Sequence, residues 1–299
     1  MLDALLADMR YAARLLTKNV AFTSVAVATL AVGVGANTAI FSVVDHVLLR
    51  PLAYRDANRL YAVHEVVPKF SHIAPLIPVN AMHFAEWRRS LRSFEHLALV
   101  SGSRMTLGGS GRPELVDTAR VTPALFPMLG VEPALGRVLR ADEDVPGNDG
   151  VVVIAHELWQ RRFAGSPGVL GRKILLDGRP YAIVGVLPAD FRFPRIAQLY
   201  AMTVNEQRPQ IWRPFAARPE ELTPLGDFNY ACIAALKTGV TLAQAASELD
   251  AVQARITETL PEKIEVRASL VPLQEQITGR AKSGLQLLLA AVAVVLLVG

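Results

Sequence analysis

Gly33 and Gly35, in the stretch LAVGVGANTAIF, have the spacing with which a dinucleotide-binding turn begins. Such a fingerprint, G-x-G-x-x-G or G-x-G-x-x-A, joins a buried strand to a helix and cradles a pyrophosphate. Asp56 follows at about the distance of the acid that binds the ribose. Thr38, however, occupies the third position, where close packing requires a small residue. The two glycines alone therefore indicate a nucleotide site only weakly.

Three further stretches resemble catalytic motifs but lack a required residue. HELWQ begins like the helix of zinc proteases, but Gln160 replaces the second histidine, so we interpret His156 as the start of a helix. GSPGVLGRK, residues 165–173, lacks the spacing of a phosphate-binding loop. Ser110 lacks the glycine that a nucleophile elbow has two residues later. We expect no enzyme, metal or cofactor chemistry from these motifs.

Acidic residues are densest in ADEDVPGNDG, which contains Asp142, Glu143, Asp144 and Asp149. Clustered carboxylates can bind calcium, but the spacing of an EF-hand is missing, so we predict a solvated turn. The single cysteine, Cys232, excludes an internal disulfide and lies in an apolar run that predicts a buried thiol.

The composition divides the chain into apolar ends and a charged middle. Of 299 residues, 52% are hydrophobic and 19% are charged, with a net charge of +4. The basic residues are dispersed and form no run with interleaved aromatics, so the sequence has no nucleic-acid footprint.

A membrane helix is the better interpretation of the stretch that contains the two glycines. The 25 residues from Val20 to Val44 carry no charge. At ~1.5 Å per residue they span about 37 Å, enough to cross a ~30 Å hydrocarbon core. We predict a transmembrane helix over 20–46. Residues 283–299 are also uncharged but too few for a full span, so we expect a second transmembrane helix that is cut by the end of the chain.

Small residues in the first span are spaced for helix packing. Ala31, Gly35 and Ala39 lie four apart and form a ridge that lets two helix backbones approach in lipid. Asn37 in the same span requires a hydrogen-bond partner, either on a neighbouring helix or in headgroup water.

Residues 1–19 predict an amphipathic helix. Arg10, Arg14 and Lys18 lie four apart on one face, and leucines lie on another. Such a helix binds the membrane interface and its lipids, although it could also pack on protein. Cations flank both ends of the first span, so the positive-inside rule leaves the orientation open.

The middle of the chain predicts an α+β fold with two β-α-β units. The first has a strand at 59–67, a helix at 79–91 and a strand at 94–101. The second has a strand at 229–237, a helix from Thr241, which begins a capping box with Gln244, and a strand at 263–273. Two such units can pair into a split β-α-β sheet with both helices on one face.

The segment between these units, about 102–215, predicts an inserted β-rich subdomain. A hairpin is expected around residues 108–111, and a strand followed by a helix in GVVVIAHELWQRRFAG. The clearest hairpin is RKILLDGRPYAIVGVLP, with Asp177 and Gly178 as its turn.

The chain resembles permeases of the MacB/FtsX type of ABC transporter, in particular long duplicated permeases without a fused ATPase. The resemblance lies in DMRYAARLLTKNVAFTSVAVATLAVGVGANTAIFSVVDHVLLRPLAYRDANRL, in VTPALFPMLGVEPALGRVLRADED and in LGRKILLDGRPYAIVGV. It implies a MacB-like periplasmic core domain over 50–280, with a porter-like part at 54–101 and 216–280 and the insertion between them.

The resemblance also implies a location and partners. The amino terminus would be cytoplasmic, and the large domain would lie outside the inner membrane. ATP hydrolysis on a separate cytoplasmic subunit would move this domain. Further partners would be the other permease half or a second copy, and a periplasmic adaptor. The chain would be the N-terminal part of such a permease. The alternatives are a two-span sensor or adaptor with a ligand-binding outer domain, or a membrane-anchored enzyme.

Overall fold

The chain divides into two compact units in the computed structural model. One, which we call the body, is Pro51–Ile277, and the other combines Met1–Arg50 with Thr278–Gly299. The structure describes residues 11, 14, 16–44, 52–109, 111–199, 208–260, 264–279, 284 and 287. The predicted helix at 1–19 and the predicted second span at 283–299 therefore lie largely outside the described residues.

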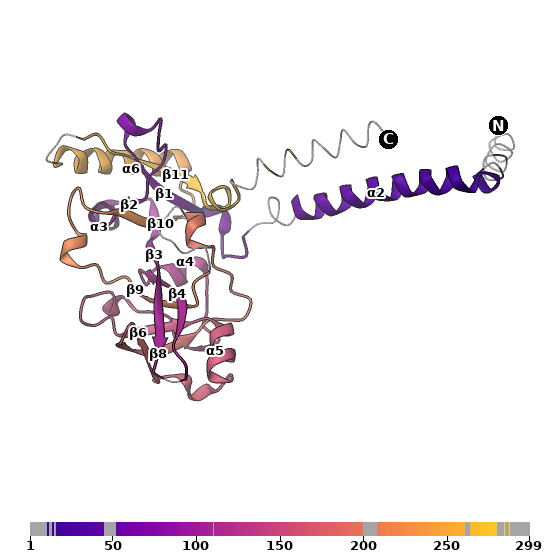
Figure 1. The fold of residues 1–299 in the computed structure, drawn as a ribbon. Coiled ribbons are helices and arrows are strands. Elements are labelled where there is room, and N and C mark those ends of the chain that lie inside the picture. The colour runs from indigo at the N-terminus through magenta and orange to yellow at the C-terminus, as the bar shows by residue number, and fades with distance from the viewer. Residues whose placement is uncertain are drawn as a thin grey trace. The chain divides into compact units, whose positions relative to one another are not determined.

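Helix α2, Val20–Val44, is the long element of the smaller unit (Figure 1). Two of its threonine side chains bond within the helix: the hydroxyl groups of Thr29 and Thr38 donate to the carbonyl oxygens of Val25 and Val34, at 2.9 and 2.8 Å. Such back-bonding satisfies a hydroxyl without water. In the described part of the chain, no helix meets the combined length and apolarity of a membrane span.

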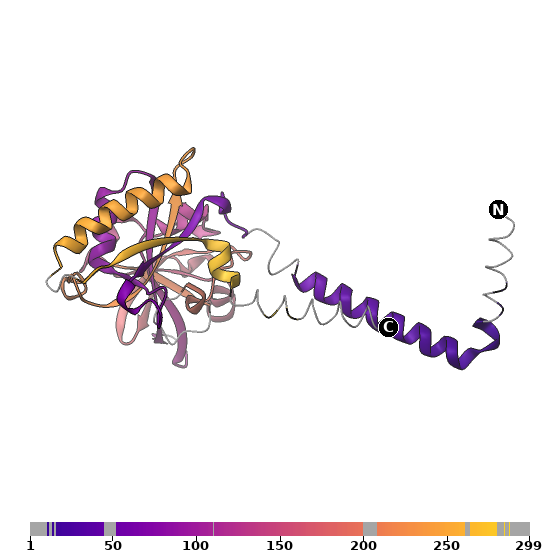
Figure 2. The same cartoon turned by 90° about the horizontal axis from the view of Figure 1, so that it is seen from above.

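The two predicted β-α-β units pair into one antiparallel sheet, which we call the split sheet. The order is β11-β1-β10-β3, so each unit places its strands on either side of a strand of the other. Helices α3 and α6 pack side by side on one face of this sheet (Figures 1 and 2). The elements are β1 Leu60–Val66, α3 Ala81–Ser90, β3 Phe94–Gly108, β10 Phe228–Leu236, α6 Leu242–Glu258 and β11 Arg267–Pro272.

Local signals set the starts of both helices. The predicted capping box is confirmed at α6, where the Thr241 hydroxyl accepts from the Gln244 amide and the Gln244 side chain accepts from the Thr241 amide. Helix α3 begins at Ala81, two residues later than predicted. The reason is Asn80, whose side-chain oxygen accepts from the amides of Met82 and His83. Residues 79–80 instead form the short strand β2, Val79–Asn80, beside β10.

Six strands of the middle segment close into a barrel. Strand β3 pairs β4, which pairs β9, and the circuit continues through β6, β8 and β7 back to β3. In Figure 1 the labels β4, β6, β8 and β9 mark the barrel walls. The elements are β4 Glu114–Val121, α4 Leu125–Leu129, β5 Leu135–Gly136, β6 Val151–Ile154, α5 His156–Phe163, β7 Lys173–Leu176, β8 Arg179–Val186 and β9 Ile211–Pro214.

Alternation along the barrel strands fills the interior with apolar side chains. Apolar residues on neighbouring strands of the barrel are almost fully buried, as expected for a small barrel. They include Leu107, Val116, Ile174, Leu176, Tyr181, Ile183 and Ile211. Short 3-10 helices connect the strands: η2 Ala57–Arg59, η3 Pro68–Phe70, η4 Ala141–Glu143, η5 Pro167–Val169, η6 Ile196–Leu199 and η7 Pro219–Glu221.

Strand β3 belongs to both parts of the body. Its first half pairs β10 in the split sheet, and from Val100 onward it pairs β4 in the barrel. The sequence predicted that a strand ends at Ser101 and a separate hairpin follows, whereas the structure has one continuous strand. The predicted turn at Asp177 and Gly178 is confirmed between β7 and β8, and both residues have positive φ, as a type I′ turn requires.

Candidate functional site at the joint of the body

The predicted helix-packing ridge lies along α2. Ala31, Gly35 and Ala39 are exposed in the described structure, and a Cβ added at Gly35 would have no neighbour within 4 Å. The side chain of Asn37 lies outside the described part of the chain. Nothing described packs against the ridge, so its role remains a prediction.

The acidic turn differs from the predicted solvated one. Glu143 and Asp149 are buried, and each binds an arginine: Glu143 pairs with Arg137 at 2.5 Å, and Asp149 with Arg179 at 2.6 Å. Each of these two carboxylates is paired with its own arginine, so they make structural contacts within the body. Among the described residues, no three His, Cys, Asp or Glu side chains are grouped closely enough to hold a metal ion.

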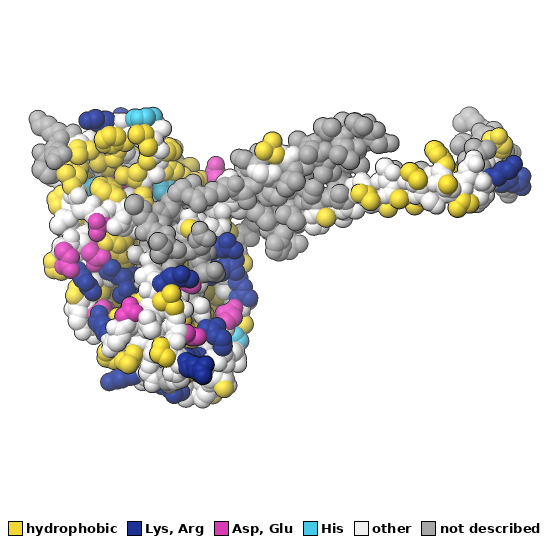
Figure 3. Space-filling model, in the orientation of Figure 1, with side chains coloured by type: hydrophobic (Ala, Val, Ile, Leu, Met, Phe, Trp, Pro, Cys, Tyr) yellow, Lys and Arg dark blue, Asp and Glu magenta, His cyan; other side chains and the backbone are white. Residues whose placement is uncertain are grey.

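The other sequence interpretations concern single residues. His156 is the first residue of α5, as predicted. Cys232 is a buried free thiol in β10, also as predicted. Charged side chains of both signs are interspersed over the barrel half of the body in the view of Figure 3.

Arg120 in β4 connects the barrel to the segment that returns to the split sheet. Its guanidinium donates to both carboxylate oxygens of Glu221 in η7, at 2.8 and 2.9 Å. It also donates to the carbonyl oxygen of Phe215 and lies over the Phe215 ring, 4.5 Å from its centroid. A bidentate arginine pair of this kind fixes orientation as well as distance.

Tyr230 in β10 extends this contact into the split sheet. Its hydroxyl donates to the Glu221 carboxylate at 2.7 Å. Burial alone would raise the pKa of Glu221, but hydrogen bonds from Arg120, the Arg218 backbone and Tyr230 lower it to about 2. Burial, followed by the Glu221 hydrogen bond, raises the pKa of Tyr230. Glu221 therefore stays ionised and Tyr230 stays protonated at neutral pH.

A second tie joins α3 to the barrel side. The backbone amide of Ala216 donates to Asp144 at 2.7 Å, and Arg88 in α3 lies 3.7 Å from the other oxygen of the same carboxylate. Burial raises the pKa of Asp144, although these neighbours oppose that shift. We call Arg88, Arg120, Asp144, Glu221 and Tyr230 together the joint.

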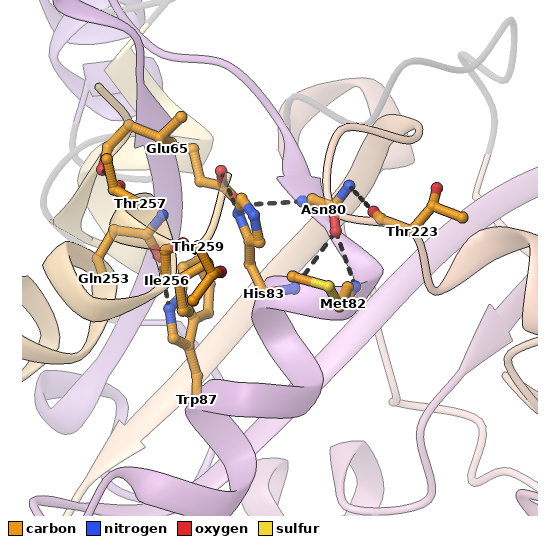
Figure 4. A network of polar contacts seen from close by, with 11 residues as sticks. Glu65, Asn80, Met82, His83, Trp87, Thr223, Gln253, Ile256, Thr257 and Thr259 are labelled. Carbon is orange, nitrogen blue, oxygen red and sulfur yellow. Dashed lines mark hydrogen bonds and ion pairs between the residues drawn. The ribbon is translucent and has the colours of Figure 1, made fainter. Parts of the chain in front are cut away.

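A buried polar network stiffens the split sheet where α3 begins (Figure 4). Glu65 in β1 has no exposed surface, and its carboxylate oxygens lie 2.9 Å from the Asn80 amide and 2.9 Å from His83 Nδ1. Asn80 also donates to the carbonyl oxygen of Thr223, at 3.1 Å. Farther along α3, the Trp87 indole donates to Gln253 of α6, at 2.9 Å.

These contacts are directional polar interactions between different parts of the body, whereas apolar contacts have no preferred direction. Sequence reasoning did not find the joint, because Arg120 and Glu221 are 101 positions apart. A weak signal existed for Glu65, an acid in the otherwise apolar strand RLYAVHEVV.

The chain resembles a known family of domains and several solved structures. Residues 23–252 match the family model of the MacB-like periplasmic core domain. Among solved structures, a domain from Porphyromonas gingivalis described as part of a permease protein has 19% identity and a TM-score of 0.53, covering 73% of this chain and 92% of that one. The periplasmic region of MacB from Actinobacillus actinomycetemcomitans has 12% identity and a TM-score of 0.51, covering 77% and 94%. These two share the fold. No curated protein matches the sequence.

Proposed function

Because this chain belongs to the family of the MacB-like periplasmic core domain, we propose that it is the N-terminal part of a permease subunit of an ABC-type export or mechanotransmission system. In this role the body is an extracytoplasmic lever. It is moved by membrane helices that respond to ATP hydrolysis on a separate cytoplasmic subunit.

Helix α2 is the proposed membrane anchor. Its 25 residues carry no charge, and at ~1.5 Å per residue their length of about 37 Å exceeds a ~30 Å hydrocarbon core. The family match covers residues 23–252, so it includes most of this helix together with most of the body. The segment before α2 would then lie on the cytoplasmic side of the inner membrane, in contact with lipid.

The observation that carries the mechanical role is the construction of the body around β3 and the joint. One strand runs from the split sheet into the barrel, and Arg120, Glu221 and Tyr230 cross-link the returning segment. A displacement applied to the split sheet is therefore passed to the barrel as a rigid motion. Rigid-body movement of packed domains is a common form of switching transition.

The proposed partners follow from this role. The ATPase is proposed to be a separate cytoplasmic chain, because the sequence resembles permeases without a fused ATPase. The other permease half, or a second copy, would supply helices for the ridge on α2. A periplasmic adaptor could bind the body.

Membrane placement can be tested by cysteine labelling, because the single native cysteine of this chain should not react with the label. Cys232 is 1% exposed, and burial raises the pKa of its thiol, so a maleimide should not modify it. Lys69→Cys places an exposed thiol on the body, and Lys18→Cys places one before α2.

A membrane-impermeant maleimide applied to intact spheroplasts should label Lys69→Cys and leave Lys18→Cys unlabelled until the membrane is permeabilised. The opposite pattern, or no labelling of Lys69→Cys in intact spheroplasts, would reject the proposed placement.

Coupling to ATP hydrolysis needs a second experiment. Full-length protein purified in mild detergent should retain an ATPase subunit, and ATP should change a distance between two spin labels, one on the body and one on that subunit. A full-length chain that carries a signalling domain and never binds an ATPase would instead support a two-span sensor or adaptor.

A further inference from the structure

A cleft of about 240 Å³ opens on the outside of the barrel, where three segments meet. One wall is the start of α5, another is the chain after β8, and the third is the chain that leads into β9. This volume is below the roughly 300–1,000 Å³ of most ligand pockets, so it suits a small molecule. The cleft is separate from the joint and is not needed for the proposed mechanical role.

The floor of the cleft is aromatic. Trp212 in β9 is 2% exposed and contacts Phe191 edge to face, with 5.9 Å between the ring centroids. Phe193 lies beside Phe191 and also lines the cleft. Such a floor binds the apolar body of a ligand better than a bare inorganic ion.

One polar atom in this floor lacks a partner. The Nε1 atom of Trp212 is buried and has no hydrogen-bond partner in the described part of the protein. A buried N–H group without an acceptor is unfavourable, and most such groups in folded proteins are paired. The indole can only donate, so the group that would satisfy it is an acceptor.

The rim of the cleft carries an excess of positive charge. Arg161, Arg192 and Arg208 line it, against the single carboxylate of Glu157. Arg192 binds Glu157 at 3.2 Å, which neutralises one of the three guanidinium groups. Arg161 is held by the Gln210 side chain at 2.9 Å and pairs with the Glu114 carboxylate at 3.4 Å, so Arg208 is the one arginine of the rim for which no ion pair is described. Arg208 is exposed.

The start of α5 adds to the positive charge at the rim of the cleft. The helix begins at His156, which lines the cleft, and its N-cap residue Ala155 makes no side-chain capping hydrogen bond. The amino end of a helix carries a partial positive charge and free N–H groups, both of which favour an anion.

From the aromatic floor, the unpaired indole N–H and the cationic rim, we propose that this cleft binds a small organic carboxylate with an aromatic or other apolar body. The carboxylate pairs with Arg208 at the rim and accepts a hydrogen bond from Trp212 Nε1, and the indole shifts toward the cleft to make this bond, because Nε1 has almost no exposed surface in the unliganded protein. The apolar body lies against Phe191 and Phe193.

The indole N–H signals of this 299-residue chain provide a direct test. The chain has three tryptophans, so ¹⁵N-labelled protein in detergent gives three indole resonances, of which Trp212→Phe identifies one. Titration with 3-phenylpropionate should shift the Trp212 resonance with a saturating curve. The uncharged 3-phenylpropionamide and inorganic phosphate should each bind at least about tenfold more weakly, since each lacks one of the two features that the cleft recognises.

Arg208→Ala is the matched variant, because Arg208 is exposed and its removal should leave the fold intact. It should weaken phenylpropionate binding by about tenfold, the effect of one charge-assisted hydrogen bond. Arg255→Ala removes an exposed arginine from α6 and should change nothing.

Equal binding of the acid and the amide would overturn the proposal in favour of a purely apolar groove. If inorganic phosphate alone shifts the Trp212 resonance equally, the cleft binds an adventitious ion only, and the proposal is rejected. A Trp212 resonance that stays fixed at millimolar phenylpropionate, or an Arg208→Ala variant that binds as the native chain does, would also reject it.

Discussion

Glu65 is a carboxyl group enclosed entirely by protein, on the face of β1 that α3 and α6 cover. Its neighbours are the Asn80 amide, His83 from α3 and the thiol of Cys232 from β10. Burial disfavours the ionised carboxylate and raises its pKa, although the bonds from His83 and Asn80 act in the opposite direction. The folded protein therefore holds a proton on Glu65 at a pH where the unfolded chain has released it.

This proton gives the stability a predictable pH dependence. Because the pKa of Glu65 is higher in the folded state, the folded state binds more protons, and the free energy of unfolding falls as pH rises above the ordinary glutamate value of about 4.3. Glu65→Gln keeps the shape and removes the titration. The stability of the native protein relative to Glu65→Gln should thus be highest in acid and decrease from pH 4 to 8.

Urea unfolding of both proteins at several pH values measures this difference. The comparison cancels the titrating groups that do not contact Glu65, including Glu221, whose lowered pKa changes the stability of both proteins alike as the pH falls from about 4.3 to about 2. A difference that stays constant, or that grows with pH, would mean that Glu65 is ionised in the folded protein.

Among the helices, strands and turns, the sequence predicted those features that depend on residues close together in the chain. The capping box of Thr241 and Gln244 and the Asp177–Gly178 turn are short motifs whose backbone requirements are local. Both β-α-β units were predicted, because their strands and helices have clear periodicity. The buried face of α6 includes Ala245, Leu249, Val252 and Ile256, whereas Leu242 at its first turn is 39% exposed.

The closure of the barrel could not be predicted in the same way. Strand β9, Ile211–Pro214, has four residues and pairs in parallel with β4, which lies about ninety positions earlier. Short strands carry little periodic signal, and distant pairing leaves none in the local sequence. The joint is hidden for the same reason, since its residues come from α3, β4, the position directly after η4, η7 and β10.

Gly102 marks the point at which β3 passes from the split sheet to the barrel. A Cβ at this position would lie 2.9 Å from Cγ1 of Ile196 in η6, closer than carbon atoms tolerate. Gly102→Ala should therefore displace η6 and reduce the free energy of unfolding by about 1–3 kcal/mol. Thermal or urea unfolding followed by circular dichroism measures the change.

Gly108 on the same strand provides the control. A Cβ there would meet Leu175 at 3.7 Å, an ordinary contact, so Gly108→Ala should leave stability unchanged or raise it by up to about 1 kcal/mol. If the two alanine variants change the free energy of unfolding equally, the close approach of η6 to β3 does not contribute to stability. Ile196→Ala combined with Gly102→Ala should relieve the contact at the cost of a lost apolar side chain.

At the scale of the whole molecule, the helix and the body depend on different interactions. Gly35→Leu should leave insertion of α2 intact, because leucine favours the hydrocarbon core, but should prevent close packing against another helix. Cross-linking of the full-length protein in membranes should show several-fold less assembly. Gly33→Leu is the matched control, since about 100° per residue places Gly33 on nearly the opposite face of the helix.

Equal assembly of the two leucine variants with the native chain would remove the packing role of Ala31, Gly35 and Ala39. If only Gly33→Leu loses assembly, the helix contact lies on the face of α2 that contains Gly33.

The body itself should unfold as one cooperative unit, although it has two hydrophobic clusters. One cluster lies between the split sheet and its helices and includes Trp87, and the other fills and surrounds the barrel and includes Trp212. Two clusters alone would allow two transitions. Strand β3 contributes to both, however, and the joint ties them, so neither cluster can lose its packing without exposing part of the other.

Tryptophan fluorescence can follow each cluster separately. A variant that keeps only Trp87 reports the split sheet, and a variant that keeps only Trp212 reports the barrel. In urea the two probes should give coincident transitions, with midpoints equal after correction for the stability of each variant. Removing Arg120 as Arg120→Met should lower both midpoints together. Two separate transitions in the native background would mean that β3 and the joint do not couple the two halves, and a lever built from them could not transmit force.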